Sequence, residues 1–161
     1  MNTASRWTIA SAIFTATSCT TPPPPVAPRG ATEVDAPFGR TWDAVVGAFA
    51  DLNIPIHTLD RASGYVATEE LSIPRELLQE ARSWAQCGSG YGPPDHAVYN
   101  VLVRGDSSRS TVRVTVRWMN TQQACATTQV WEQCRESEIK SRAEGQVPAA
   151  CRSAVSPGGR K

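Results

Sequence analysis

The stretch STVRVTVRWMN, Ser110–Asn120, gives the clearest indication of a sheet, because apolar and polar side chains alternate along most of it. Successive residues of a strand point to opposite faces of a sheet, so the alternation separates an apolar face from a polar one. The apolar set is Val112, Val114, Val116 and Trp118, and the polar set is Thr111, Arg113, Thr115 and Arg117. One buried and one solvated face is typical of an antiparallel sheet. We expect the Arg113/Arg117 face to be solvated, and a surface for an anionic partner is the alternative.

Other strands surround this one in the predicted sheet. The strands that we predict are residues 32–35, 54–60, 65–70 and 96–105. The last of these should form a hairpin with Ser110–Asn120. The second and third should form a hairpin around the turn RASG, in which Gly64 can adopt a positive φ. Pro55 has no N–H to donate, so it must occupy a first position or an edge.

The clearest helix is FGRTWDAVVGAFADLN, residues 38–53. Its large apolar residues recur every three or four positions and therefore share one face: Phe38, Trp42, Val45, Phe49 and Leu52. We interpret this face as core packing. Residues 74–86 and 128–144 predict two further helices. The last has a poorly apolar stripe of Val130 or Trp131, Cys134, Ser137 or Glu138, and Ser141.

The fold class that these elements predict is α+β, an antiparallel sheet with helices packed on one face. We assign the globular domain to residues 31–152 and a flexible tail to residues 153–161. A formal net charge of +1 leaves no basic surplus for binding nucleic acid.

Residues 1–18 have the pattern of an export signal. Arg6 comes first, a short apolar stretch follows, and small residues precede Cys19. The apolar part is shorter than the roughly 20 residues that span a bilayer. A buried N-terminal helix is the alternative.

The segment Ala16-Thr17-Ser18-Cys19 resembles the lipobox of bacterial lipoproteins. The resemblance implies cleavage before Cys19, a lipid on its thiol and, with Thr20 next, sorting to the outer membrane. Ala16 stands where Leu is usual, so cleavage by an ordinary signal peptidase, giving a soluble periplasmic or secreted protein, stays open. Residues 19–30 are rich in proline and predict an extended tether.

The four remaining cysteines are Cys87, Cys125, Cys134 and Cys151. An even number in an exported chain predicts disulfides. We favour Cys87–Cys125, because the strong hairpin returns the chain to its starting edge, and Cys134–Cys151. A Cys125–Cys134 bridge is the alternative. A zinc site is disfavoured because no CxxC is present and the histidines lie far from the last three cysteines.

Motifs for catalysis are absent from the sequence. It contains neither HExxH nor GxSxG, and the glycine-rich loop at 88–94 lacks the lysine of a P-loop. Asp95 and His96 are neighbours, and we expect adjacent strand residues to point apart. The acidic pairs Glu69–Glu70 and Glu136/Glu138 have no evident catalytic partner. We therefore predict no catalytic residue, cofactor or metal.

Three runs share a family resemblance: WDAVV at 42–46, LNIPI at 52–56 and LDRASGYVAT at 59–68. Together they resemble the helix-grip modules of bacterial envelope lipoproteins, such as the BamC-type component of the outer-membrane assembly machine. The resemblance implies a single helix-grip domain, anchored at the outer membrane and facing the periplasm, that binds an envelope protein without catalysis. The alternatives are a small-ligand-binding module, with its pocket between helix 38–53 and the sheet, and an exported hydrolase.

Overall fold

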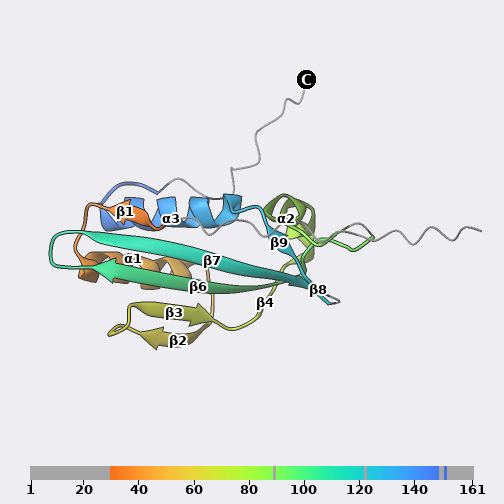
Figure 1. Ribbon diagram of the computed structural model, residues 1–161, viewed down its shortest axis with the longest axis horizontal. Helices are drawn as coiled ribbons and strands as arrows, with labels where there is room; N and C mark the ends of the chain where they lie inside the picture. Colours follow the sequence, from red (N-terminus) through yellow and green to blue (C-terminus); the bar gives the residue numbers. More distant parts are fainter. Residues whose placement is uncertain (1–29, 89, 122, 149–150, 152–161) are drawn as a thin grey trace, which may run out of the picture.

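The computed structural model describes residues 30–88, 90–121, 123–148 and 151. The predicted signal, Cys19, nearly all of the tether and the tail at 153–161 lie outside the described residues. The described residues form an α+β fold with a mostly antiparallel sheet and three α-helices (Figure 1). The elements are, in order, β1 (Thr32–Val34), α1 (Phe38–Asp51), β2 (Ile56–Asp60), β3 (Tyr65–Thr68), β4 (Leu71–Ser72), the 3-10 helix η1 (Arg75–Leu77), α2 (Leu78–Trp84), β5 (Ala85–Gln86), β6 (His96–Gly105), β7 (Ser110–Asn120), β8 (Gln123–Ala124), β9 (Ala126–Thr127) and α3 (Val130–Ala143).

The main sheet is built around the hairpin β6–β7, as the sequence predicts. Its order is β1-β7-β6-β3-β2, with β4 beside the start of β6 and β8 beside the end of β7. The β6–β7 register runs from His96 opposite Met119 to Gly105 opposite Ser110. The apolar set of β7 is buried, and Thr115 and Arg117 on the other face are exposed. The alternation therefore predicted both the strand and its buried face.

The turn between β2 and β3 confirms the expectation for Gly64. Its φ is 68°, and a Cβ at this position would collide with the carbonyl oxygen of Val103. The same close approach lets the Val103 N–H donate to the Gly64 carbonyl at 2.8 Å. Only glycine meets both conditions at once, because it has no Cβ and tolerates positive φ.

Helices α1 and α3 cover the same face of the sheet (Figure 1). Phe49 of α1 lies edge-on to Tyr99 of β6, with 6.2 Å between ring centroids. Trp131 of α3 donates its indole N–H to the hydroxyl of the same tyrosine. Because both helices meet at one inward-facing residue, the core lies between this face and the two helices.

The predicted helix over 74–86 is shorter in the structure. Residues 75–77 form the 3-10 helix η1, and α2 ends at Trp84. Ala85 has an extended backbone and begins β5, which pairs with β9. This pairing, fastened by the disulfide at Cys87, draws the chain out of the helix two residues early.

The stripe predicted for α3 is found in one of its alternatives: Trp131 and Glu138 are buried, and Cys134 and Ser141 are half-buried. Val130 and Ser137 are exposed, and Glu132 and Glu136, which the stripe did not contain, are buried as well. Glu136 is buried because it accepts hydrogen bonds from distant segments. Strand β1 starts opposite Val112, so the N–H of Val114 lies beyond its end, and it donates to Glu136 Oε1 at 2.9 Å. Thr32 donates to the other oxygen of Glu136 at 2.6 Å.

Candidate binding site

Four aromatic side chains gather at one end of the inward face. They come from α2, β6, β7 and α3: Trp84, Tyr99, Trp118 and Trp131. Ring centroids lie 4.3 Å apart for Trp84 and Trp131, and 5.5 Å apart for Trp84 and Trp118. Tyr99 lies edge-on to Trp118 at 6.4 Å. Tilted and edge-on arrangements of this kind are the ones that packed aromatic rings prefer.

A pocket opens onto this cluster, and we call it the aromatic pocket. Its volume is about 340 Å³, and the four aromatic residues line it together with Leu52–Ile54, Leu71–Pro74, Leu77, Glu80, Ala97 and Arg135. Small-molecule sites are typically concave, largely apolar and roughly 300–1,000 Å³ in volume. The aromatic pocket has these properties and lies at the carboxyl-terminal end of α1, beside the sheet.

Polar groups in the aromatic pocket are mainly hydrogen-bond donors. Trp131 Nε1 donates to Tyr99 Oη at 2.7 Å. Trp118 is 1% exposed, and its Nε1 has no acceptor among the described residues. Burial raises the pKa of Tyr99 to about 12, so its hydroxyl keeps its proton at neutral pH. Arg135 lies over the Trp131 ring at 4.4 Å, a cation–π contact.

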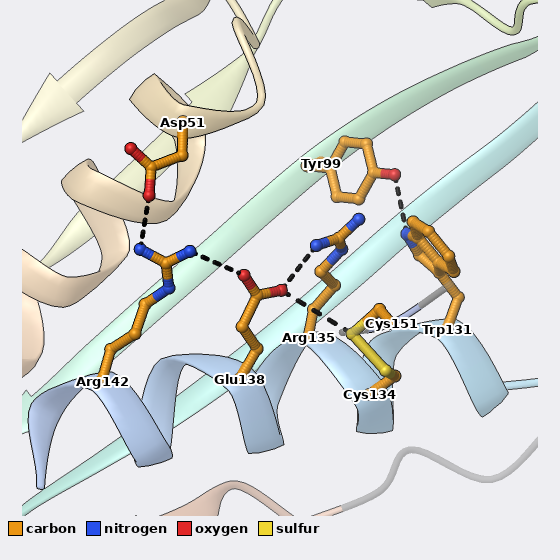
Figure 2. A network of polar contacts seen from close by, with 8 residues as sticks. All are labelled: Asp51, Tyr99, Trp131, Cys134, Arg135, Glu138, Arg142 and Cys151. Atoms are coloured by element: carbon orange, nitrogen blue, oxygen red, sulfur yellow. Dashed lines mark hydrogen bonds and ion pairs between the residues drawn. A yellow bond between two sulfur atoms is a disulfide. The ribbon is translucent and has the colours of Figure 1, made fainter. Parts of the chain in front are cut away.

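An ion-pair network holds Arg135 in place (Figure 2). Arg135 Nη1 lies 2.5 Å from Glu138 Oε2, and Arg142 Nη2 donates to Glu138 Oε1 at 3.1 Å. Arg142 Nη1 also donates to Asp51 Oδ2 at 2.6 Å, which links α3 to the end of α1. The hydrogen bond to Asp51 raises the pKa of Arg142 above its ordinary value. The network thus connects the pocket wall to both helices.

Disulfides brace the same region. Cys87 pairs with Cys125 and Cys134 with Cys151, the pairing that the sequence analysis favours. The first links the segment after β5 to the residue between β8 and β9. In the second, Cys151 Sγ lies 3.7 Å from Glu138 Oε2, so the bridge packs against the ion-pair network (Figure 2). Each bridge holds a segment that carries a residue of the aromatic pocket, Trp84 in the first case and Arg135 in the second.

The opposite face of the sheet carries arginines, and we call it the open face. Arg113 and Arg117 alternate with the buried valines of β7, and Arg104 of β6 pairs with Thr111 in the register. Arg104 and Arg117 are exposed and Arg113 is half-buried. Among the described residues, no ion pair involves any of these three arginines. The open face therefore carries three arginines without ion pairs to described residues, together with the acidic Glu33 of β1 opposite Thr111.

The two histidines occupy separate strands. His57 is an exposed residue of β2. His96 Nδ1 lies 2.8 Å from Asp95 Oδ1, and its Nε2 lies 4.0 Å from Glu70 Oε1. The expectation that Asp95 and His96 point apart is wrong, because the two side chains contact each other where Asp95 precedes the start of β6. The acidic residues Glu136 and Glu138 lie on the buried face of α3 and make the hydrogen bonds and ion pairs described above.

The described ranges contain neither a metal-binding cluster nor a helix that could span a membrane. Within them, no group of three or more His, Cys, Asp or Glu side chains is arranged to bind a metal ion. None of the helices in this part of the chain is long and apolar enough to cross a membrane.

No protein-family model matches the chain, and no curated protein matches it.

Sequence reasoning did not predict the aromatic pocket as a set of residues. The alternation in Ser110–Asn120 predicts an inward face for Trp118, but its meeting with Trp84 and Trp131 depends on how three distant elements pack. The available signal was three tryptophans placed on separate predicted elements of a short chain. The predicted pocket between helix 38–53 and the sheet corresponds to only one wall of it, at Leu52–Ile54.

Proposed function

We propose that this chain is an exported bacterial envelope lipoprotein whose domain binds a protein partner without catalysis. In this proposal residues 1–18 are removed, Cys19 carries the lipid, and residues 19–30 tether the domain to the outer membrane on its periplasmic side. The two disulfides support export, because such bridges persist in oxidising compartments. The lipobox-like residues before Cys19 support the anchor.

A helix-grip domain is part of the same proposal. Its support is the chain order, in which α1 leads directly into the hairpin β2–β3 and packs across the antiparallel sheet. The resemblance in residues 42–68 falls on these same elements. A binding role without catalysis accords with the positions of the histidines, since His57 is exposed on β2 and His96 pairs with carboxylates at the start of β6.

The open face is the observation that carries the binding role. Three arginines that form no ion pair with described residues project from adjacent strands, beside the half-buried Tyr65 and Leu102. A positive surface attracts and orients a partner of opposite charge. We therefore take the partner to be an envelope protein that presents an acidic surface.

Crosslinking in the native host, followed by mass spectrometry, tests this role. The double variant Arg113→Ser/Arg117→Ser should lose the crosslinked partner. The control Arg75→Ser removes an exposed arginine of η1, away from the open face, and should keep it. An unchanged set of crosslinks in the double variant would contradict the proposed surface.

The anchor is tested separately by fractionation of cells. Cys19→Ser should move the protein from the membrane fraction to the soluble fraction. A variant that stays in the membrane fraction would show that Cys19 is not the anchor. Wild-type protein found only in the soluble fraction would support a periplasmic or secreted protein instead.

A further inference from the structure

We infer that the aromatic pocket binds a small, largely apolar molecule that carries a carboxylate. This goes beyond the proposed protein-binding role, because it concerns the helix-covered face of the sheet rather than the open face. It depends on neither the anchor nor the partner.

Several hydrogen-bond donors among the residues that line the aromatic pocket have no acceptor within the described ranges. Trp118 Nε1 is buried and has no acceptor among the described residues. The hydroxyl of Tyr99 accepts the hydrogen bond from Trp131, and its own proton has no acceptor in this part of the chain. Arg135 Nε is also buried without an acceptor, although Nη1 of the same side chain contacts Glu138. Burying a donor without a partner costs about 1–3 kcal/mol, so such groups in a pocket indicate what it should receive.

A carboxylate is the acceptor that fits these donors. A carboxylate offers only acceptors, on two oxygens, and hydrogen bonds to it are stronger when one donor is charged. Arg135 supplies that charged donor, and the Tyr99 hydroxyl, which is protonated at neutral pH like that of any tyrosine, supplies a neutral one. Figure 2 shows the guanidinium of Arg135 alongside the Tyr99–Trp131 pair.

The shape and lining of the aromatic pocket suit a small, largely apolar molecule. Besides the aromatic rings, its lining includes the apolar side chains of Leu71, Ile73 and Leu77. A volume of about 340 Å³ suits a small molecule rather than a folded partner. Glu80 also lines the pocket and would favour a cation, so the charge of the ligand must be tested directly.

Calorimetric titration of the purified full chain provides the test, with octanoate and octylamine as probes of equal length and opposite charge. Octanoate should bind and octylamine should bind at least about tenfold more weakly. Trp118→Phe keeps an aromatic ring but removes the N–H, and it should weaken octanoate binding about tenfold. Tyr99→Phe serves as a second variant if Trp118→Phe does not fold. Trp42→Phe is the matched control, since Trp42 stacks on Phe38 outside the pocket and should bind octanoate as wild type does.

Three results would overturn the inference. Octanoate failing to bind would remove the site. Octylamine binding as tightly as octanoate would show that the pocket does not select a carboxylate. Equal octanoate affinity in wild type, Trp118→Phe and Tyr99→Phe would show that the unpartnered donors have no part in binding.

Discussion

Helices α1 and α3 have equal length and cover the same face of the sheet, yet they are attached to it in opposite ways. The buried residues of α1 are mostly apolar: Thr41, Trp42, Val45, Ala48 and Phe49. Half of the buried residues of α3 are glutamates: Trp131, Glu132, Glu136, Glu138, Ile139 and Ala143. The first helix is held by apolar burial, whereas the second is held by carboxylates that accept hydrogen bonds and by a disulfide.

This difference bears on the candidate site, because the polar helix supplies more of the aromatic pocket. Trp131 and Arg135 of α3 line the aromatic pocket, whereas α1 contributes only the residues that follow its end. Sequences commonly depart from ordinary local patterns at functional sites. The buried glutamates fix the rotation of α3 about its axis, and that rotation directs Trp131 toward Tyr99 and places Arg135 over the indole ring.

Trp42→Ala should have the largest effect and tests the apolar attachment of α1. Trp42 is 4% exposed, and losing a large buried aromatic side chain costs about 3–5 kcal/mol of the free energy of unfolding. Urea unfolding would measure the loss. Asp43→Ala is the control, because Asp43 is exposed on the same turn, and it should change stability by less than about 0.5 kcal/mol. Equal stability of wild type and Trp42→Ala would mean that α1 is not held by this face.

Removing the α3 disulfide should have the next largest effect. The double variant Cys134→Ala/Cys151→Ala opens a loop with a sequence separation of 17 residues. The chain-entropy account gives a loss of about 3 kcal/mol for a loop of this size. Thermal unfolding under non-reducing conditions measures it, and peptide mapping checks that Cys87–Cys125 remains. A melting temperature unchanged from wild type would show that α3 does not need the bridge.

Glu136→Leu tests whether α3 needs its buried carboxylate, because the substitution makes its buried face more apolar, like that of α1. Glu136 is 1% exposed, so a leucine there would normally favour burial. The substitution leaves the N–H of Val114 without its acceptor, and we expect a loss of about 1–3 kcal/mol. Glu136→Gln keeps one acceptor oxygen and should lose less. Leucine that stabilises the protein would show that apolar packing, and not the carboxylate, is what this position requires.

Glu144 gives the smallest effect and adds a pH dependence. The hydrogen bond from Lys140, then that from the backbone N–H of Asp35, holds the pKa of Glu144 below its ordinary value. Because the folded-state pKa is lower than the unfolded one, the charge stabilises the fold above about pH 4.3 and the benefit is lost as pH falls through the folded value. Glu144→Gln should therefore cost less than about 1 kcal/mol at pH 7, and less still near pH 3. Urea unfolding at both pH values checks this, and an equal cost at both would contradict it.

How much the sequence could predict differs between the same two helices. Spacing predicts the buried face of α1 at Trp42, Val45 and Phe49, because its contacts are apolar and non-specific, but it is wrong at Leu52, which follows the end of the helix and is 40% exposed. The alternation along β7 predicts its buried face in the same way. The buried face of α3 depends on two partners of Glu136 that lie far away in the chain: the N–H of Val114 and the hydroxyl of Thr32. Local periodicity does not contain these contacts. The aromatic pocket escaped prediction for the same reason, since it needs α3 in its observed rotation.

Hydrogen exchange of the backbone amides, read by mass spectrometry, tests the central comparison most directly. Wild type and Glu136→Leu would be labelled at neutral pH and compared over α1 (Phe38–Asp51) and α3 (Val130–Ala143). Local opening exposes amides according to the stability of each segment. If α3 is held by its carboxylates, exchange should become faster over α3 in the variant and stay unchanged over α1. Equal acceleration in both helices, or no change in α3, would contradict the account.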